Sequence, residues 1–154
     1  MEKIINPILK KLVIKPTLSC YCNCSFCKDR QLFYQGQKIL NPISLEIIKN
    51  IFSQAADLGV ESLQISGGDP LLYDHLLDVI KEAKKYGWFV FINSVGYGVT
   101  KGKVLDMLHA GLSAFNVSLD SPLPGIHNAL RGAVNIFEHT TNTIKIFSDI
   151  KKMN

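Results

Sequence analysis

A repeated pattern of a glycine, a short apolar run and small polar residues limits what this 154-residue chain can fold into. The pattern occurs in LGVESLQISGG (58–68), YGWFVFINSVG (86–96) and AGLSAFNVSLD (110–120). A glycine suits the left-handed end of a helix, and the run after it has the length and composition of a β-strand. Each segment therefore predicts the end of a helix followed by a strand.

The segments between these strands carry apolar residues at helical spacing. We expect helices over 44–58, 74–86, 101–110 and 134–151, and an earlier strand in KLVIKPT (11–17). Four β-then-α units in a row predict an α/β fold with a parallel sheet and right-handed crossovers.

Finer features of these elements can also be predicted. Ser44 is suited to cap the first helix, and the uniformly apolar WFVFI (88–92) predicts a strand covered on both faces. PLPGIHNALRG (122–132) is expected to be a loop. The stripe expected on one face of the last helix consists of Phe137, Thr141, Ile144 and Phe147.

Composition excludes several classes of protein. The net charge of +4 is small and the lysines are scattered, so neither nucleic acid nor an anionic membrane is an expected partner. The first fifteen residues contain a proline and several lysines rather than an apolar signal core, and no stretch is long enough to span a bilayer. We expect a cytoplasmic protein with reduced thiols, which favours metal or redox chemistry over disulfides.

Polar clusters follow each expected strand. They are a cysteine-rich loop after the first strand and the segments 66–70, 93–96 and 118–120 after the others. Ligands of parallel βα folds gather at the carboxyl ends of the strands. The four clusters therefore predict one site on a single rim of the sheet.

The cysteine loop holds all four cysteines of the chain within eight positions. Cys20, Cys24 and Cys27 have the spacing CxxxCxxC, which would let three thiolates hold a 4Fe–4S cluster with one iron open to a substrate. Phe26 would add an aromatic wall, and Cys22 is surplus. The alternative is a zinc site with four cysteine ligands, although zinc ligands commonly come as two separated pairs.

The turn Gly67-Gly68-Asp69-Pro70 also has two interpretations. The two glycines would let a ligand approach the backbone, and Asp69 could meet an ammonium group. Taken alone, the same four residues favour an ordinary tight turn, because Gly-Asp-Pro is typical of turns.

Taken together, these motifs resemble a known family. CxxxCxxC after a first strand, ISGGDP (65–70) after a second and NVSLD (116–120) at the end of a fourth resemble a radical S-adenosylmethionine (radical SAM) enzyme. The resemblance covers about nine-tenths of the chain, from Leu12 onward. The stretch from Ser118 to Lys145 is similar to the subgroup that matures peptides and proteins or builds molybdenum cofactor precursors.

The resemblance implies a role for each residue on the rim. Three irons of a 4Fe–4S cluster would be held by the CxxxCxxC cysteines, and the fourth iron would chelate S-adenosylmethionine. The other cofactor-binding residues would be Gly67, Gly68 and Asp69 at its ammonium group, Ser118 and Arg131 at its carboxylate, Phe26 near its adenine and Asn93 near its nucleoside.

The resemblance also implies an activity and partners. One electron, from a donor such as flavodoxin or ferredoxin, would cleave the cofactor to methionine and a 5′-deoxyadenosyl radical. That radical would take a hydrogen atom from a peptide or protein substrate. A cluster-binding half-barrel without turnover, or a cysteine-rich zinc module, remains as an alternative function.

The chain departs from the family pattern in four ways. Asp69 replaces the more usual glutamate, NSVG (93–96) stands where many relatives have Thr-Asn-Gly, and Cys22 is extra. The family core typically has six βα units and this chain has four. Residues 1–154 are thus expected to form a single, TIM-barrel-like core domain that is incomplete at its C-terminus. A partner chain or second copy would cover the open edge at 113–119.

Overall fold

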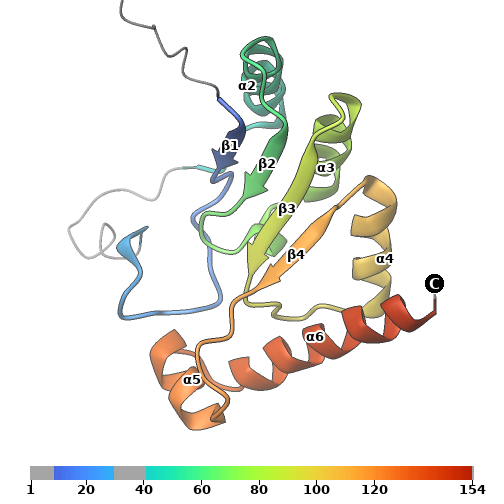
Figure 1. Ribbon diagram of the computed structural model, residues 1–154. Coiled ribbons are helices and arrows are strands. Elements are labelled where there is room, and N and C mark those ends of the chain that lie inside the picture. Colours follow the sequence, from blue (N-terminus) through green and yellow to red (C-terminus); the bar gives the residue numbers. More distant parts are fainter. Residues whose placement is uncertain (1–8, 30–40, 154) are drawn as a thin grey trace, which may run out of the picture.

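The structure is a computed structural model that describes residues 9–29 and 41–153 (Figure 1). Four strands alternate with helices along the chain, as predicted. In order, the elements are β1 (Lys11–Ile14), α2 (Leu45–Asp57), β2 (Ser62–Ile65), the 3-10 turn η1 (Pro70–Leu72), α3 (Leu76–Lys85), β3 (Phe89–Ser94), α4 (Lys101–Ala110), β4 (Ala114–Val117), α5 (Pro124–Arg131) and α6 (Ile136–Lys152).

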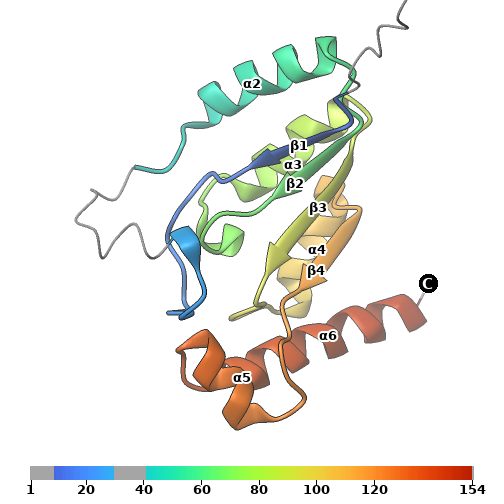
Figure 2. The same cartoon turned by 60° about the vertical axis from the view of Figure 1, so that its left-hand side comes forward.

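The four strands form one parallel sheet in the order β1-β2-β3-β4. Figures 1 and 2 show all four arrowheads directed toward the end of the sheet where α5 lies. The architecture is an α/β partial barrel, which confirms the predicted fold class. Within the described residues β4 pairs only with β3, so it is an edge of the sheet, as expected.

Local signals placed most of the helix boundaries correctly. The side chain of Ser44 accepts a hydrogen bond from the backbone of Ile47 at 3.3 Å and caps α2 as predicted. Gly111 ends α4 with a φ of 107°, a left-handed conformation that glycine adopts without a steric penalty.

Two predictions about the C-terminal third were wrong. The segment expected to be a loop contains α5, which has Pro124 in its first turn and ends at Gly132, the usual boundary residues of a helix. The buried side chains of α6 are not the predicted stripe but Ile136, Thr140, Thr143 and Ile150.

Hydroxyl groups explain the error in α6. Thr140 and Thr143 donate hydrogen bonds of 2.8 Å to the carbonyl oxygens of Val95 and Gly96, at the end of β3. A buried hydroxyl is tolerated when it is hydrogen-bonded, so a polar pair lies in the middle of a contact face that Ile136 and Ile150 complete. A pattern of apolar residues alone cannot reveal such a face.

The two faces of the sheet differ in burial. Leu63, Ile65, Val90 and Ile92 point to the face covered by helices and are fully buried. On the opposite face Phe89 is 53% exposed, so the expectation that β3 is covered on both faces was wrong for this chain. Along the part of the chain that the structure describes, no helix has the length and apolar character needed to cross a membrane.

Candidate functional site

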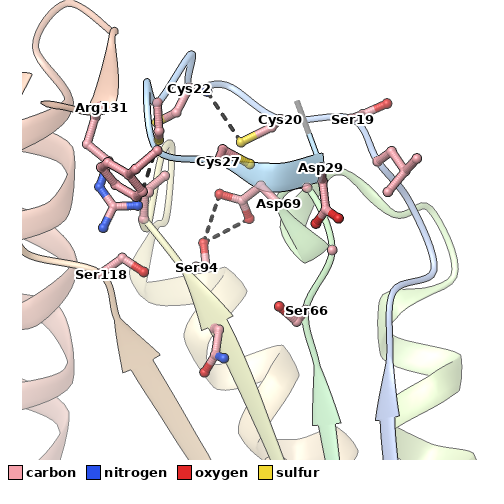
Figure 3. Close-up of a pocket in the computed structure, with 17 residues that line it drawn as sticks. Ser19, Cys20, Cys22, Cys27, Asp29, Ser66, Asp69, Ser94, Ser118 and Arg131 are labelled. Carbon is pink, nitrogen blue, oxygen red and sulfur yellow. Dashed lines mark hydrogen bonds between the residues drawn. The ribbon is translucent and has the colours of Figure 1, made fainter. Parts of the chain in front are cut away.

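The carboxyl ends of the strands surround a cavity of about 650 Å³ (Figure 3). The cysteine loop, the turn after β2, the end of β3, the residue after β4 and the end of α5 all contribute to it. Its lining consists of Leu18, Ser19, Cys20, Cys22, Cys24, Phe26, Cys27, Asp29, Ser66, Gly67, Gly68, Asp69, Asn93, Ser94, Val95, Ser118 and Arg131.

All ten residues that the sequence proposed for a site line this one cavity. They come from positions as distant along the chain as Cys20 and Arg131. The convergence follows from parallel strands, whose carboxyl ends meet at one edge. The roles of these residues stay predictions, whereas their meeting in space is a finding.

The cysteine loop is attached to α5 and α6. The backbone N–H of Asn23 donates to the carbonyl oxygen of Arg131 at 2.8 Å. A Cβ on Gly132 would lie 2.3 Å from the carbonyl oxygen of Asn23, so the two segments touch through their backbones. Cys22 is buried against Val95 and Ile136, and a hydrogen bond with Cys20, together with burial, raises the pKa of its thiol.

The surplus thiol therefore has a packing role that the sequence did not assign. Cys22 fills an apolar cluster, as a small hydrophobic residue does. Of the three proposed ligands, Cys20 is exposed and Cys24 and Cys27 are half-buried.

The two glycines of the turn after β2 pack against the chain's own backbone. A Cβ on Gly67 would lie 2.4 Å from the carbonyl oxygen of Thr17, and one on Gly68 would lie 2.1 Å from that of Ser19. Hydrogen bonds from Gly68 N–H to Thr17 (2.9 Å) and from Asp69 N–H to Ser19 (2.7 Å) hold the same contact. These glycines thus bring the turn against the segment that leads into the cysteine loop.

Asp69 is almost completely buried, with 1% of its surface exposed. Its carboxylate accepts hydrogen bonds from the hydroxyl of Ser94 at 2.8 and 3.0 Å (Figure 3). It also accepts one from the backbone of Leu71 at 3.1 Å. Burial raises the pKa of this carboxyl group, and the hydrogen bonds oppose the shift. Ser94 also accepts from the Gly96 N–H at 2.9 Å, so Asp69 is joined firmly to the end of β3.

Arg131 reaches the cavity from the end of α5. Its Nε and Nη2 donate to the two carboxylate oxygens of Asp120 at 2.5 and 2.8 Å, a bidentate pair. Nη1 lies 4.0 Å from the sulfur of Cys24, and the guanidinium carbon lies 5.5 Å from the centre of the Phe26 ring. Burial raises the pKa of the Cys24 thiol, and the neighbouring guanidinium opposes that shift.

The ends of β3 and β4 supply the remaining predicted residues. Asn93 accepts a 2.8 Å hydrogen bond from the side chain of Asn116 on the adjacent strand. The backbone of Ser118 donates to Ser94 at 2.9 Å, which continues the pairing of the two strands to the cavity wall.

The thiols on the cavity wall are the ligand type that both iron–sulfur clusters and zinc ions take. Within residues 9–29 and 41–153, no three His, Cys, Asp or Glu side chains lie close enough together to hold one metal ion. A zinc ion would need its thiolates within roughly 4 Å of one another, because the Zn–S bond is about 2.3 Å. A cuboidal cluster instead distributes its cysteine ligands over separate irons.

A comparison with protein families agrees with this site. The model of the radical SAM superfamily matches residues 14–152. The chain therefore belongs to the radical SAM superfamily, whose members carry an iron–sulfur cluster and bind S-adenosylmethionine.

Several solved structures share the fold. SuiB of Streptococcus suis, bound to its precursor peptide SuiA, matches 90% of this chain with a TM-score of 0.68 and 19% identity. Methylornithine synthase (PylB) matches 92% with a TM-score of 0.70 and 15% identity, and anSMEcpe with bound AdoMet matches 94% with 0.70 and 16%. The chain spans 31%, 42% and 40% of the length of these three proteins, respectively.

Sequence reasoning missed several residues that position the site. Ser94 and Asp120 belong to polar clusters that the sequence marked, but nothing local showed that they bind Asp69 and Arg131. His127, placed in a loop by the sequence, is fully buried on α5, and its Nδ1 accepts from the backbone of Asp120 at 3.2 Å. Burial lowers the pKa of this imidazole.

Proposed function

We propose that this protein binds a 4Fe–4S cluster through Cys20, Cys24 and Cys27 and uses S-adenosylmethionine to abstract a hydrogen atom from a substrate. The observation that carries the proposal is the meeting of all ten predicted residues around one cavity. Once bound and reduced, the cluster would supply one electron that splits the cofactor into methionine and a 5′-deoxyadenosyl radical.

The residues of the chain would bind and orient the cofactor. Asp69, Gly67 and Gly68 form the wall proposed for its ammonium group. Because Ser94 and the backbone of Leu71 already hold the carboxylate of Asp69, this acid is fixed before any ligand arrives. A preorganised charge costs little reorganisation when the ligand binds.

The opposite wall would hold the rest of the cofactor. Ser118 and Arg131 are proposed for the carboxylate. Asp120 binds Nε and Nη2 of Arg131, and Nη1, which lies 4.0 Å from the sulfur of Cys24, is the nitrogen proposed to reach the carboxylate. Phe26 offers an aromatic face for the adenine, and Asn93 an amide for the nucleoside. The cavity lining comes from the cysteine loop, the strand ends and α5, so several segments would contact and orient the cofactor.

The proposal extends to the substrate and the partners. A peptide or protein substrate is favoured by the maturase-like stretch from Ser118 to Lys145, and SuiB has been solved with its precursor peptide. We further propose a cytoplasmic location, an electron donor such as flavodoxin or ferredoxin, and a single core domain over 1–154. A partner chain or a second copy would cover β4.

One anaerobic experiment tests the proposal. The purified protein is reconstituted with iron and sulfide, its iron is counted, and dithionite and S-adenosylmethionine are added. About four irons per chain with 5′-deoxyadenosine formed would support it. Cys24→Ala should lose both, whereas Cys22→Ala should keep the cluster. Zinc in place of iron, with no cluster, would refute it.

A cluster-binding half-barrel without turnover is the second candidate. The open face of the sheet favours it, because Val13 and Phe89 are about half exposed where a complete barrel would enclose them. A stable cluster with no deoxyadenosine, even with saturating reductant, would select this candidate.

A further inference from the structure

Arg131 is the only lysine or arginine among the described residues that line the cavity. Contacts with Asp120 and Phe26 hold its guanidinium group in a defined position. Asp120 binds two of its nitrogens, and the Phe26 ring lies 5.5 Å from its guanidinium carbon. The third nitrogen, Nη1, lies 4.0 Å from the sulfur of Cys24.

The backbone fixes the same arrangement. The carbonyl oxygen of Arg131 accepts from Asn23, the residue just before Cys24, at 2.8 Å. Gly132 leaves no room for a side chain against Asn23. The distance between the guanidinium and Cys24 is therefore set by two backbone contacts as well as by the side chains.

In the part of the chain that the structure describes, the cavity wall carries two further acidic side chains, and neither places a free negative charge opposite Cys24. The carboxylate of Asp29 is paired with Lys15 at 2.8 and 2.9 Å, and that of Asp69 is buried with Ser94. Arg131 is thus the cation that a redox centre at Cys24 would face, and Asp120 is the anion that partly cancels it.

We propose that Arg131 and Asp120 act as an opposed pair of positioning residues that sets the reduction potential of a cluster held by Cys24. This inference rests on the proposed function. Reduction adds one electron to the cluster, and a nearby cation stabilises the added negative charge. Net charge and hydrogen bonds at the sulfurs are known determinants of cluster potentials. Arg131 therefore favours the reduced state, and Asp120 weakens that effect.

The test is a redox titration of the reconstituted cluster without S-adenosylmethionine, followed by electron paramagnetic resonance. Arg131→Gln should lower the equilibrium constant for reduction about tenfold, which is about 59 mV for a one-electron couple. Asp120→Asn should raise it about threefold, because the guanidinium is then uncancelled. Arg131→Lys keeps the charge and should stay within about threefold of the unmodified protein.

Lys85→Gln is the matched control. Lys85 forms an ion pair with Glu82 at 2.7 Å on α3, outside the cavity lining, and its loss should leave the potential unchanged. Loosening of the loop alone would shift the potential in the same direction in Arg131→Gln and Asp120→Asn, with a loss of iron in both. A shift in the same direction in both variants, or reduction potentials equal to that of the unmodified protein, would overturn the inference.

The outcomes separate this inference from the proposed function. If Arg131→Gln fails to hold iron, Asp120→Asn decides, since it must still raise the equilibrium constant for reduction, and an unchanged or lowered constant in that variant overturns the inference. A cluster with unmoved potentials overturns only the role of the pair. No cluster in the unmodified protein overturns the proposed function and this inference together.

Discussion

Replacement of Gly68 by alanine tests whether the turn after β2 supports the site through backbone contact. The new Cβ would lie 2.1 Å from the carbonyl oxygen of Ser19 and 2.6 Å from the carbonyl carbon of Leu18, where ordinary contact begins near 3.4 Å. Both neighbours are backbone atoms, so no side chain can rotate away. The turn and the segment before the cysteine loop would have to separate by about an ångström or more.

The expected loss of stability follows from the interactions that this separation would break. The hydrogen bonds from Gly68 to Thr17 and from Asp69 to Ser19 each contribute about 1 kcal/mol. Overpacking adds about 1–2 kcal/mol. The free energy of unfolding should therefore fall by about 3–4 kcal/mol, a large part of the roughly 5–15 kcal/mol typical of a domain.

Urea unfolding followed by circular dichroism measures this change. Gly125→Ala is the matched control, because a Cβ there meets nothing within 4 Å, and its effect should stay under about 1 kcal/mol. Iron binding after reconstitution is the second readout and should fall only in Gly68→Ala. If both variants unfold at the same urea concentration, the turn does not support the loop and the reasoning is wrong.

Three further predictions concern the same rim. Ser94→Ala removes the hydroxyl that donates to Asp69 and accepts from Gly96, and should cost about 2–3 kcal/mol in urea unfolding. Burial raises the pKa of Asp69 above its ordinary value of 3.8, so its contribution to stability is complete below that value and is lost as the pH rises through the folded-state pKa. Asp69→Asn should therefore gain stability relative to the unmodified protein from about pH 4 upward, and a difference that is constant with pH would contradict this. Cys22→Ala should cost about 1–2 kcal/mol through poorer packing, with no change in iron content; loss of iron would instead make Cys22 a ligand.

Local patterns in the sequence were sufficient for most of the fold. A glycine after a helix and an apolar run after that glycine are short-range features, and they located three of the four strands, while β1 was expected from its own short apolar run. The CxxxCxxC loop and the polar clusters at the strand ends contain nine of the ten residues expected at the site, whereas the tenth, Arg131, was expected from the family resemblance alone. Even α5 carried local boundary signals, Pro124 and Gly132, which were present in the sequence but not used.

Contacts between distant segments could not be predicted in this way. Thr140 and Thr143 face the core because their hydroxyl groups donate hydrogen bonds to carbonyl oxygens just after β3. The spacing of apolar residues in α6 does not predict these contacts. The exposure of Phe89 likewise depends on what covers the second face of the sheet. The apolar composition of β3 does not show whether that face is covered.

The sequence by itself predicted a site at the carboxyl ends of four parallel strands and named ten of the residues that line the cavity there. The tertiary structure decided how those residues are held. Ser94 holds Asp69 across 25 positions, and Arg131 meets Cys24 across 107. The geometry of neighbouring strands and loops decides which side chains meet, because a hydrogen bond depends on the distance and angle between its two groups. Two residues far apart in the chain can satisfy these conditions without any recognisable spacing in the sequence.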